Sequence, residues 1–561
     1  MEALQPDIYV MLLMLSPLIA AVLSLLGKAF PRIHMPVFSF FVWAGGTIFA
    51  LLKTNSVVFT LRPRFYPIGG WPDPIGIVLE LNGISWIVSL FIVFIFSAIW
   101  FATYRQKIYG SAFYLVLYLT HFALQGILFS RDLFNLFVWF EVLSLCSIIL
   151  VAYDRSPPAL LAAFRYLMLS TISIVFYLLG LWIIYMYTGS LSFSEIGAFL
   201  QARSGENLKP FTIAMGLISA GLLTRSAIIP FHTWLPPAHS AAPYPVSALL
   251  SGLVIKIPLL ALWHFMLYIP LFPLYQLFIW IGFGSALIGG AAALLQSDAK
   301  RILAYSSVGQ IGFILSAMGG AAQLAGSAAL FYILLHAVSK ALLFLTIGYV
   351  THAAGSRNVY LLRGLQRRFP FAALCFWIAA FTLIGVPFSG GYYAKLLVFT
   401  SLYNQAGAWM LTVAGGFTAA ALFKLGRIFT GRPDSASPKK VHFEDKVAAR
   451  PLLLNVSLTL LALICAVFTV FYEPLFEFLN PVTGISHIGA PIPDIDWHAE
   501  MNLLKAALIS MAGGLGIFIL HIKHIRTAAR RIVTIGACGL NRAVFLLIAG
   551  ILMFLLYAAI A

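Results

Sequence analysis

The chain has 561 residues, of which 61% are hydrophobic and 9% are charged, and its mean hydropathy is +0.96. A soluble domain is about 45–50% apolar, so this composition excludes a soluble protein and predicts an all-α protein that crosses a membrane many times. The formal net charge is +17, which by itself would also suit a nucleic-acid partner.

Apolar runs of about 20 residues predict about 16 transmembrane helices. In chain order these are 8–28, 35–53, 83–102, 111–130, 133–152, 161–187, 211–228, 246–268, 274–296, 301–320, 326–350, 371–402, 407–430, 451–472, 502–522 and 541–560. No basic residue precedes the first run, so we expect a retained helix and not a cleaved signal peptide.

Basic residues are concentrated on one side of these helices. Alternate loops on that side hold 23 of the 35 Lys and Arg residues, and the loops on the other side hold six. Cytoplasmic loops of membrane proteins are enriched in Lys and Arg. We therefore expect the basic side to be cytoplasmic and both termini to face outward. Topology then accounts for the net charge, and no nucleic-acid partner is expected.

Polar segments separate some of the predicted helices. Residues 55–82 are rich in proline and predict an outer loop with short strands. Residues 430–450 predict a cytoplasmic linker. Residues 473–500 hold five acids and no Lys or Arg, and they predict an outer linker.

Two of the predicted helices are broken by proline and glycine, around 225–245 and 385–395. The residues that define these breaks are Pro230, His232, Pro236, Pro237, Pro387, Gly390 and Gly391. Proline removes a backbone donor, and open backbone within a membrane is tolerated only where it is buried in protein or lines water. We expect irregular backbone until Val246, satisfied by polar side chains such as Trp234 and His239. Paired broken helices are typical of inverted repeats with a site near the membrane midplane.

Six ionisable side chains lie well inside apolar runs: Glu141, Arg225, Lys256, His336, Lys340 and Lys395. A charge at mid-bilayer costs from about 2.5 to well over 10 kcal/mol, and such residues usually mark ion or proton paths. Burial favours the neutral form of lysine, which suits a proton relay. We expect protons to pass between Lys256 and Lys395 through the other two buried bases of the second half.

Arg225 has a different expected role, because a guanidinium stays protonated in proteins. We expect a fixed cation that pairs with Glu141 and tunes Lys256 by repulsion. Each of these residues could instead be a satisfied structural group. Lys424 is expected to snorkel, His264 to be structural, and Lys300 to set topology, with a role in proton uptake as the alternative for Lys300.

Several stretches together resemble a known family of membrane proteins. They are LFNLFVWFEVLSLCS (133–147), PFHTWLPPAHSAAPYPVSALLSG (230–252), SDAKRILAYSSVGQIGF (297–313), HAVSKALLFL (336–345) and GVPFSGGYYAKLLVF (385–399). In this order they resemble the antiporter-like subunits of NADH:quinone oxidoreductase, Mrp-type sodium/proton antiporters and membrane-bound hydrogenases. The resemblance covers roughly residues 110–430 and looks closest to the Mrp D-type subunit.

The resemblance implies a 14-helix antiporter-like core with two inverted five-helix repeats. The implied divisions are 1–110 (helices 1–3), 111–270 (helices 4–8), 271–430 (helices 9–13), and 431–561 (helix 14 and two extra C-terminal helices). By the matching motifs, Glu141 is the helix-5 glutamate and Lys256 the helix-8 lysine of the family. His336 and Lys340 match the central helix-11 pair, and Lys395 matches the helix-12 residue.

Arg225 departs from the family pattern, which has lysine at that position of helix 7. The alternative to a fixed tuning cation is therefore a first half-channel that no longer pumps.

The sequence predicts a proton-translocating subunit of a multisubunit complex in the inner membrane of a bacterial or archaeal cell. Other membrane subunits, including homologous antiporter-like ones, are its expected partners, and the expected ions are protons, either alone or together with sodium. The four scattered cysteines have neither metal nor redox spacing, so no cofactor, metal or catalytic centre is expected, even if the complex is an oxidoreductase. The alternatives are a stand-alone transporter of a small solute and a transport-inactive structural subunit.

Overall fold

The computed structural model describes most of the chain between residues 7 and 516. The described ranges are 7–26, 34–71, 73–104, 106, 108–203, 209–268, 272–320, 325–402, 408–431, 451–482, 508–509 and 511–516. Within them, eleven helices are long and apolar enough to cross a membrane. The spans expected at 541–560 and, in large part, at 502–522 lie outside the described residues, as does the linker expected after residue 431.

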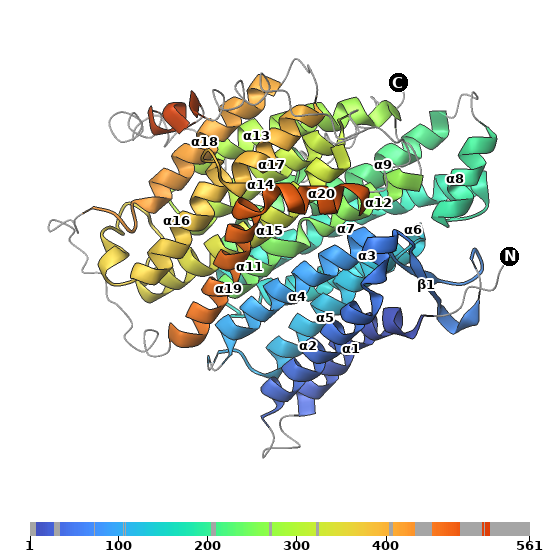
Figure 1. Ribbon diagram of the computed structural model, residues 1–561, viewed down its shortest axis with the longest axis horizontal. Coiled ribbons are helices and arrows are strands. Elements are labelled where there is room, and N and C mark those ends of the chain that lie inside the picture. Colours follow the sequence, from blue (N-terminus) through green and yellow to red (C-terminus); the bar gives the residue numbers. More distant parts are fainter. Residues whose placement is uncertain are drawn as a thin grey trace.

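The N-terminal part of the chain, up to residue 129, forms one flank of the molecule (Figure 1). Its elements are α1 (Ile8–Leu25), α2 (Met35–Thr54), α3 (Ser56–Thr60), β1 (Arg64–Pro67), η2 (Ile68–Gly70), β2 (Val78–Leu81), α4 (Gly83–Thr103) and α5 (Ser111–Phe129). Helix α1 packs on α2 and α5. The strands pair in antiparallel register, with Phe65 opposite Glu80, which confirms the short strands expected between residues 55 and 82.

The next part of the chain contains the first broken helix. Its elements are α6 (Leu133–Val151), α7 (Pro157–Thr188), α8 (Phe193–Ala202), α9 (Lys209–Arg225), η3 (Phe231–Trp234), α10 (Leu235–Ala241), α11 (Tyr244–Leu249), the π-helical η4 (Leu250–Val254) and α12 (Ile257–Tyr268). The break after Arg225 is confirmed. The expectation of irregular backbone until Val246 was wrong, because Pro236 and Pro237 occupy the first turn of α10, where backbone amides need no partner within the helix.

The second half repeats this pattern with a break between two short helices. Its elements are α13 (Phe272–Leu295), α14 (Ala299–Met318), α15 (Ala325–Ala353), η5 (Leu365–Arg367), α16 (Pro370–Ile384), α17 (Gly390–Ser401), α18 (Ala408–Gly426), α19 (Pro451–Val470) and α20 (Tyr472–Val482). Helix α20 begins where the sequence predicted an outer linker, so that linker is partly helical.

The second break depends on two glycines. Gly385 ends α16 with a φ of +77°, a left-handed conformation that favours glycine. A Cβ on Gly391 would lie 1.5 Å from the carbonyl oxygen of Thr382. Only glycine therefore lets α17 start against the end of α16, which confirms the predicted break.

Helix α15 lies in the interior of the fold (Figure 1) and contacts α4, α11, α14, α16, α17 and α19. The most apolar windows of α15 and of the segment Tyr244–Leu267 are buried along their whole length. A helix that is apolar on all sides is typical of such a core. The charged residues on these two segments are therefore surrounded by protein and not by lipid.

Candidate functional site

Glu141 and Arg225 form an ion pair between α6 and the broken end of α9. The guanidinium donates to the carboxylate over 2.6 Å and to the carbonyl of Phe140 over 3.0 Å, and it also bonds the hydroxyl of Ser144. The Arg225 side chain is only 7% exposed, whereas that of Glu141 is 39% exposed. The predicted pairing is confirmed, and its acid lies at the surface of the chain.

The opened backbone after Arg225 is held by side chains from several helices. The indole of Trp234 donates to the carbonyl of Thr224 over 2.9 Å and stacks on Tyr166. The amide of Ile229 donates to the hydroxyl of Ser285 over 3.1 Å. The break is thus a fixed feature of the fold.

Lys256 lies at the junction between the π-helical segment and α12, and its side chain is 1% exposed. Its ammonium donates to the carbonyl of Ser251, one π-turn earlier. Single π-turns inside helices occur frequently at functional sites. The sequence predicted the position of Lys256 in the interior, but gave no sign of the π-turn.

A short series of hydrogen bonds joins Lys256 to Lys340. The hydroxyl of Ser251 lies 2.9 Å from that of Ser307, which donates to the carbonyl of Leu303 over 3.0 Å. The ammonium of Lys340 donates to the same carbonyl over 3.1 Å. Lys256 bonds the carbonyl of Ser251, so the two buried lysines are linked through the backbone and side chain of Ser251, the hydroxyl of Ser307 and the carbonyl of Leu303.

Two histidines lie next to this connection without fixed partners. His336 and His239 are both fully buried, and none of their four ring nitrogens has a hydrogen-bond partner among the described residues. The charges of Lys256 and Lys340 act on both rings, and that of Lys300 acts on His239 as well. His239 was expected to satisfy the opened backbone, and this was wrong. Its imidazole stacks on Phe344 and faces the lysines.

One face of α14 leads from Lys340 toward Lys395. Lys340 also bonds Ser306, and one turn further Gln310 accepts from the hydroxyl of Tyr332 over 2.6 Å. Another turn further, the ring of Phe313 lies 5.5 Å from the Lys395 ammonium. Positions three and four residues apart share a helix face, so these groups lie in one line.

Lys395 sits in the second helix break. Its ammonium donates over 2.6 Å to the carbonyl of Ile384, the last residue of α16. A carbonyl at a helix end has no partner within its own helix, so Lys395 supplies the missing donor. The predicted position early in a re-formed helix is confirmed.

Lys300 lies at the start of α14, beneath an open cavity of about 370 Å³. Its ammonium donates to the carbonyl of Ala242 and lies 3.4 Å from the hydroxyl of Ser247. Asp154, which follows α6, and His352, in the last turn of α15, also line the cavity. A buried amine thus contacts a space that reaches the protein surface.

Lys424 differs from its expected role. It does not snorkel, because its side chain is 2% exposed and its ammonium donates over 2.7 Å and 2.5 Å to the carbonyls of Leu294 and Gln296. It satisfies the end of α13 instead.

The polar groups that lie between the charges were not among the predicted site residues. These are Ser251, Ser306, Ser307, Gln310 and Tyr332, together with the chemical role of His239. Three of them lie in the stretch 297–313 that carried part of the resemblance. Within the described part of the chain, no three His, Cys, Asp or Glu side chains lie together as a metal site would require.

Two broken helices, a central buried helix and a series of interior lysines define an antiporter-like membrane protein. A family model for the transmembrane part of NADH:quinone oxidoreductase and Mrp antiporter subunits matches residues 130–422. The chain belongs to this family.

Relatives in the family carry two kinds of name. The chain is 32% identical over 435 residues to NADH-quinone oxidoreductase subunit N of Desulforudis audaxviator, covering 74% of this chain and 85% of that protein. It is 31% identical to the putative antiporter subunit mnhA2 of Staphylococcus aureus, covering 78% of this chain but 59% of the longer relative. These names differ from the D-type subunit that the sequence favoured.

Two solved complexes contain chains of the same fold. One is the archaeal membrane-bound sulfane sulfur reductase, with a TM-score of 0.75, 25% identity, and coverage of 85% of this chain and 96% of that one. The other is the Mrp complex of Dietzia sp. DQ12-45-1b, with a TM-score of 0.75, 22% identity, and coverage of 88% and 99%. The chain is accordingly an antiporter-like subunit of the type found in multisubunit membrane complexes.

Proposed function

We propose that this subunit moves protons along the line of interior bases from Lys256 through Lys340 to Lys395. The observation that carries the proposal is the hydrogen-bonded connection between Lys256 and Lys340 through Ser251, Ser307 and Leu303. A buried amine can give up its proton at low cost, and hydroxyls can both accept and donate. The carbonyls of Ser251 and Leu303 only accept and hold the two ammonium groups in place, so a proton would pass by way of the Ser251 and Ser307 hydroxyls that lie between the lysines.

His336 and His239 are proposed as stations beside this route. A histidine whose nitrogens are free of fixed partners can accept a proton from a neighbouring lysine and release it again. Lys300 and the cavity above it are proposed as the point where protons exchange with the basic side, which we take to be the cytoplasm. Both termini would then face outward.

Arg225 is proposed as the fixed charge of the first half. Its guanidinium keeps its proton, so it can act on Lys256 only through its field. Movement of the Glu141 carboxylate would change that field by exposing or compensating the arginine. The alternative, a first half that no longer pumps, predicts that the pair serves stability alone.

Neighbouring membrane subunits are proposed to cover Glu141. A carboxylate that is 39% exposed within a helix long enough to span the membrane would be costly against lipid. A homologous subunit of a larger complex in the cell's inner membrane would shield it. Coupling to sodium exchange or to redox chemistry would then come from those partners.

The test uses everted membrane vesicles that contain the whole complex. Internal acidification is followed with a pH-sensitive dye, energised by an electron donor in one assay and challenged with sodium chloride in another. Lys256→Ala, Lys340→Ala and Lys395→Ala are each expected to lower proton translocation by about tenfold or more while the complex stays assembled. Lys53→Ala, at the exposed end of α2, is the control and should translocate normally.

The same experiment separates the alternatives. Normal translocation in all three assembled lysine variants would make the chain a structural subunit. Activity of the isolated chain on a small solute, with no proton movement, would make it a stand-alone solute transporter. The relatives named above are complex subunits, which supports the proton-translocating interpretation over both.

A further inference from the structure

A second polar cluster lies between the β-hairpin and the far end of α12, away from the line of lysines. Glu80 of β2 is 3% exposed and pairs with Arg131, with 3.0 Å between Oε2 and Nε. His264 of α12 lies with Nε2 4.0 Å from the other carboxylate oxygen of Glu80. The guanidinium of Arg131 lies over the ring of Phe65 on β1. The hairpin therefore holds an acid, a permanent cation and a histidine in one buried place.

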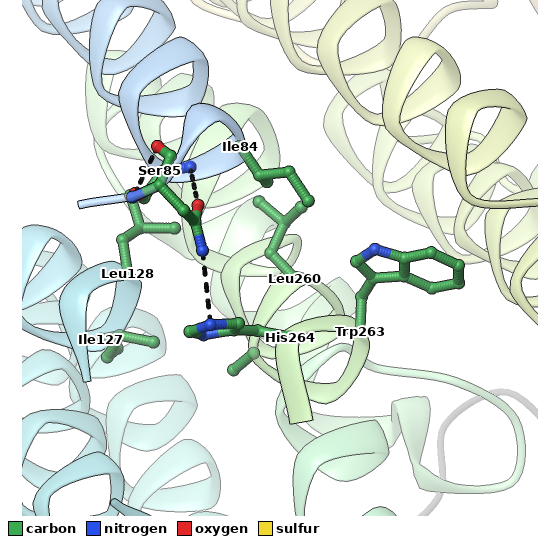
Figure 2. A pocket seen from close by; sticks show the side chains of 9 residues that line it. Ile84, Ser85, Ile127, Leu128, Leu260, Trp263 and His264 are labelled. Atoms are coloured by element: carbon green, nitrogen blue, oxygen red, sulfur yellow. Dashed lines mark hydrogen bonds between the residues drawn. The ribbon is translucent and has the colours of Figure 1, made fainter. Parts of the chain in front are cut away.

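The orientation of Asn82 assigns the proton of His264. Asn82 and Ser85 form a reciprocal capping box, in which the side-chain oxygen of Asn82 accepts from the Ser85 amide over 2.9 Å. The nitrogen of the same side chain must then face His264 Nε2, 3.3 Å away (Figure 2). Because an amide nitrogen only donates, Nε2 accepts, and the imidazole is neutral with its proton on Nδ1.

The same geometry offers His264 a second partner. If Nε2 gains a proton, it can no longer accept from Asn82 and becomes a donor. Glu80 Oε1, which also accepts from the side-chain amide of Asn82 over 3.3 Å, lies 4.0 Å away, and a small turn of the ring would bring it into hydrogen-bond range. Glu80 and Arg131 act on the charge of His264 in opposite directions. The carboxylate stabilises a protonated ring, and the guanidinium destabilises it.

A small cavity adjoins this cluster. A cavity of about 20 Å³ is lined by Asn82, Ser85, Leu260, Ala261 and His264 (Figure 2), which is room for about one water molecule. Leu260 is one helical turn beyond Lys256, and His264 is two turns beyond it, or about 12 Å along the axis. The cavity therefore lies on the same helix as Lys256 and begins one turn beyond it, at Leu260.

We propose that His264 and Glu80 form a proton-exchange site for the first half of the chain, on the side opposite the basic loops. This rests on the proposed function, since Lys256 supplies the proton. His264 Nε2 takes the proton, the ring turns to Glu80, and the N–H bond breaks as an O–H bond forms on Oε1. The neutral carboxyl no longer balances the charge of Arg131, so it gives its proton up to outside water and the starting state is restored.

The rest of the polar interior provides a contrast. His121 on α5 is also fully buried, but both of its ring nitrogens are engaged, by Trp43 over 2.7 Å and by Gln125 over 3.0 Å. The Trp43 indole can only donate, so His121 cannot take a second proton without breaking that bond. His121 is therefore a suitable control for a buried histidine that carries no proton.

The test compares His264→Gln, the double variant Glu80→Gln/Arg131→Gln, and His121→Gln in the assembled complex, by the vesicle assay above. The double variant removes acid and cation together, so that no unpaired charge remains buried. We expect the first two variants to lower translocation by about tenfold or more. Their residual rate should no longer depend on the pH at the face opposite the basic loops, which is the lumen of the everted vesicles. His121→Gln should keep both the rate and its pH dependence.

The proposal is overturned if His264→Gln or the double variant assembles and translocates like the unmodified complex while Lys256→Ala does not. If Lys256→Ala is itself unimpaired, the proposed function fails and the exchange site fails with it, so the two failures are distinguishable. Should His264→Gln not assemble, the double variant alone decides, because it leaves α12 unchanged.

Discussion

Lys256 and Lys340, which are 84 residues apart in the sequence, donate into one hydrogen-bonded segment of the core. Lys256 bonds the carbonyl of Ser251 and Lys340 bonds that of Leu303, and the hydroxyls of Ser251 and Ser307 close the gap between them. Each lysine thus depends on polar groups of a neighbouring element. The pair of serines lies where η4 of the first half approaches α14 of the second.

Removing these hydroxyls should slow proton transfer without unfolding the protein. In Ser251→Ala/Ser307→Ala the two lysines keep their carbonyl partners but lose the connection between them. A net hydrogen bond is worth about 0.5–1.5 kcal/mol, so we expect translocation to fall by about two- to tenfold. Ser316→Ala is the matched control, because that hydroxyl bonds mainly its own helix. Equal rates in the double variant and the control would show that protons take another route.

The arginine of the first half leads to a second prediction. Arg225→Lys keeps a cation beside Glu141 but cannot reproduce the bonds to Phe140 and Ser144, and a lysine can lose its charge. If Arg225 acts as a fixed charge, translocation should fall severalfold in complexes of normal composition. The vesicle assay measures the rate, and gel filtration measures assembly. Unchanged or faster translocation would mean that a permanent charge is not required there.

Much of this site was predictable because charges and prolines are costly within a membrane. Glu141, Lys340 and Lys395 are charged residues within apolar runs of the sequence. Proline and glycine in two further runs predict the two broken helices. The connecting groups carry no comparable signal. Serine and glutamine are tolerated in many buried helices, and the helices that matter most are buried on all sides, so no periodicity marks the face that contains Ser307 or Gln310.

The predictions for Lys424 and His239 were wrong for the same physical reason. In both cases, contacts between neighbouring elements determine where the side chain lies. Lys424 looked like a snorkelling residue because it lies near the end of a span, but the end of α13 lies beside it and lacks donors. His239 looked like a partner for opened backbone, but α10 is a regular helix and leaves the ring free to face the lysines. Neither arrangement can be inferred without the packing of neighbouring helices.

His239 leads to a third prediction, which distinguishes a functional group from a structural one. Both ring nitrogens are buried and have no partner among the described residues, which costs about 1–3 kcal/mol for each unsatisfied group. His239→Phe keeps the stacking on Phe344 and removes that cost. We expect a complex that is as stable as the original or more so, with reduced translocation. Thermal unfolding and the vesicle assay measure the two effects, and a destabilised variant with normal translocation would make His239 structural.

The break in the second half leads to the last prediction. A methyl group on Gly391 would meet the carbonyl of Thr382 at 1.5 Å, and neither backbone can yield easily because α16 and α17 also pack on α19. Overpacking of this kind costs about 1–3 kcal/mol or more, so Gly391→Ala should lower the amount of assembled complex and its thermal stability. The surviving complex should also translocate poorly, because Lys395 depends on the same break for its bond to Ile384.

Gly284→Ala is the matched control for this substitution. Gly284 lies inside α13, and a Cβ there would have no neighbour within 4 Å. Alanine is favoured over glycine in a helix interior by about 1 kcal/mol, so this variant should be at least as stable as the original. If Gly391→Ala behaved like Gly284→Ala in both assembly and translocation, the close approach of α16 and α17 would not be what holds Lys395 in place. The lysine would then owe its position to its contact with Phe313 on α14 instead.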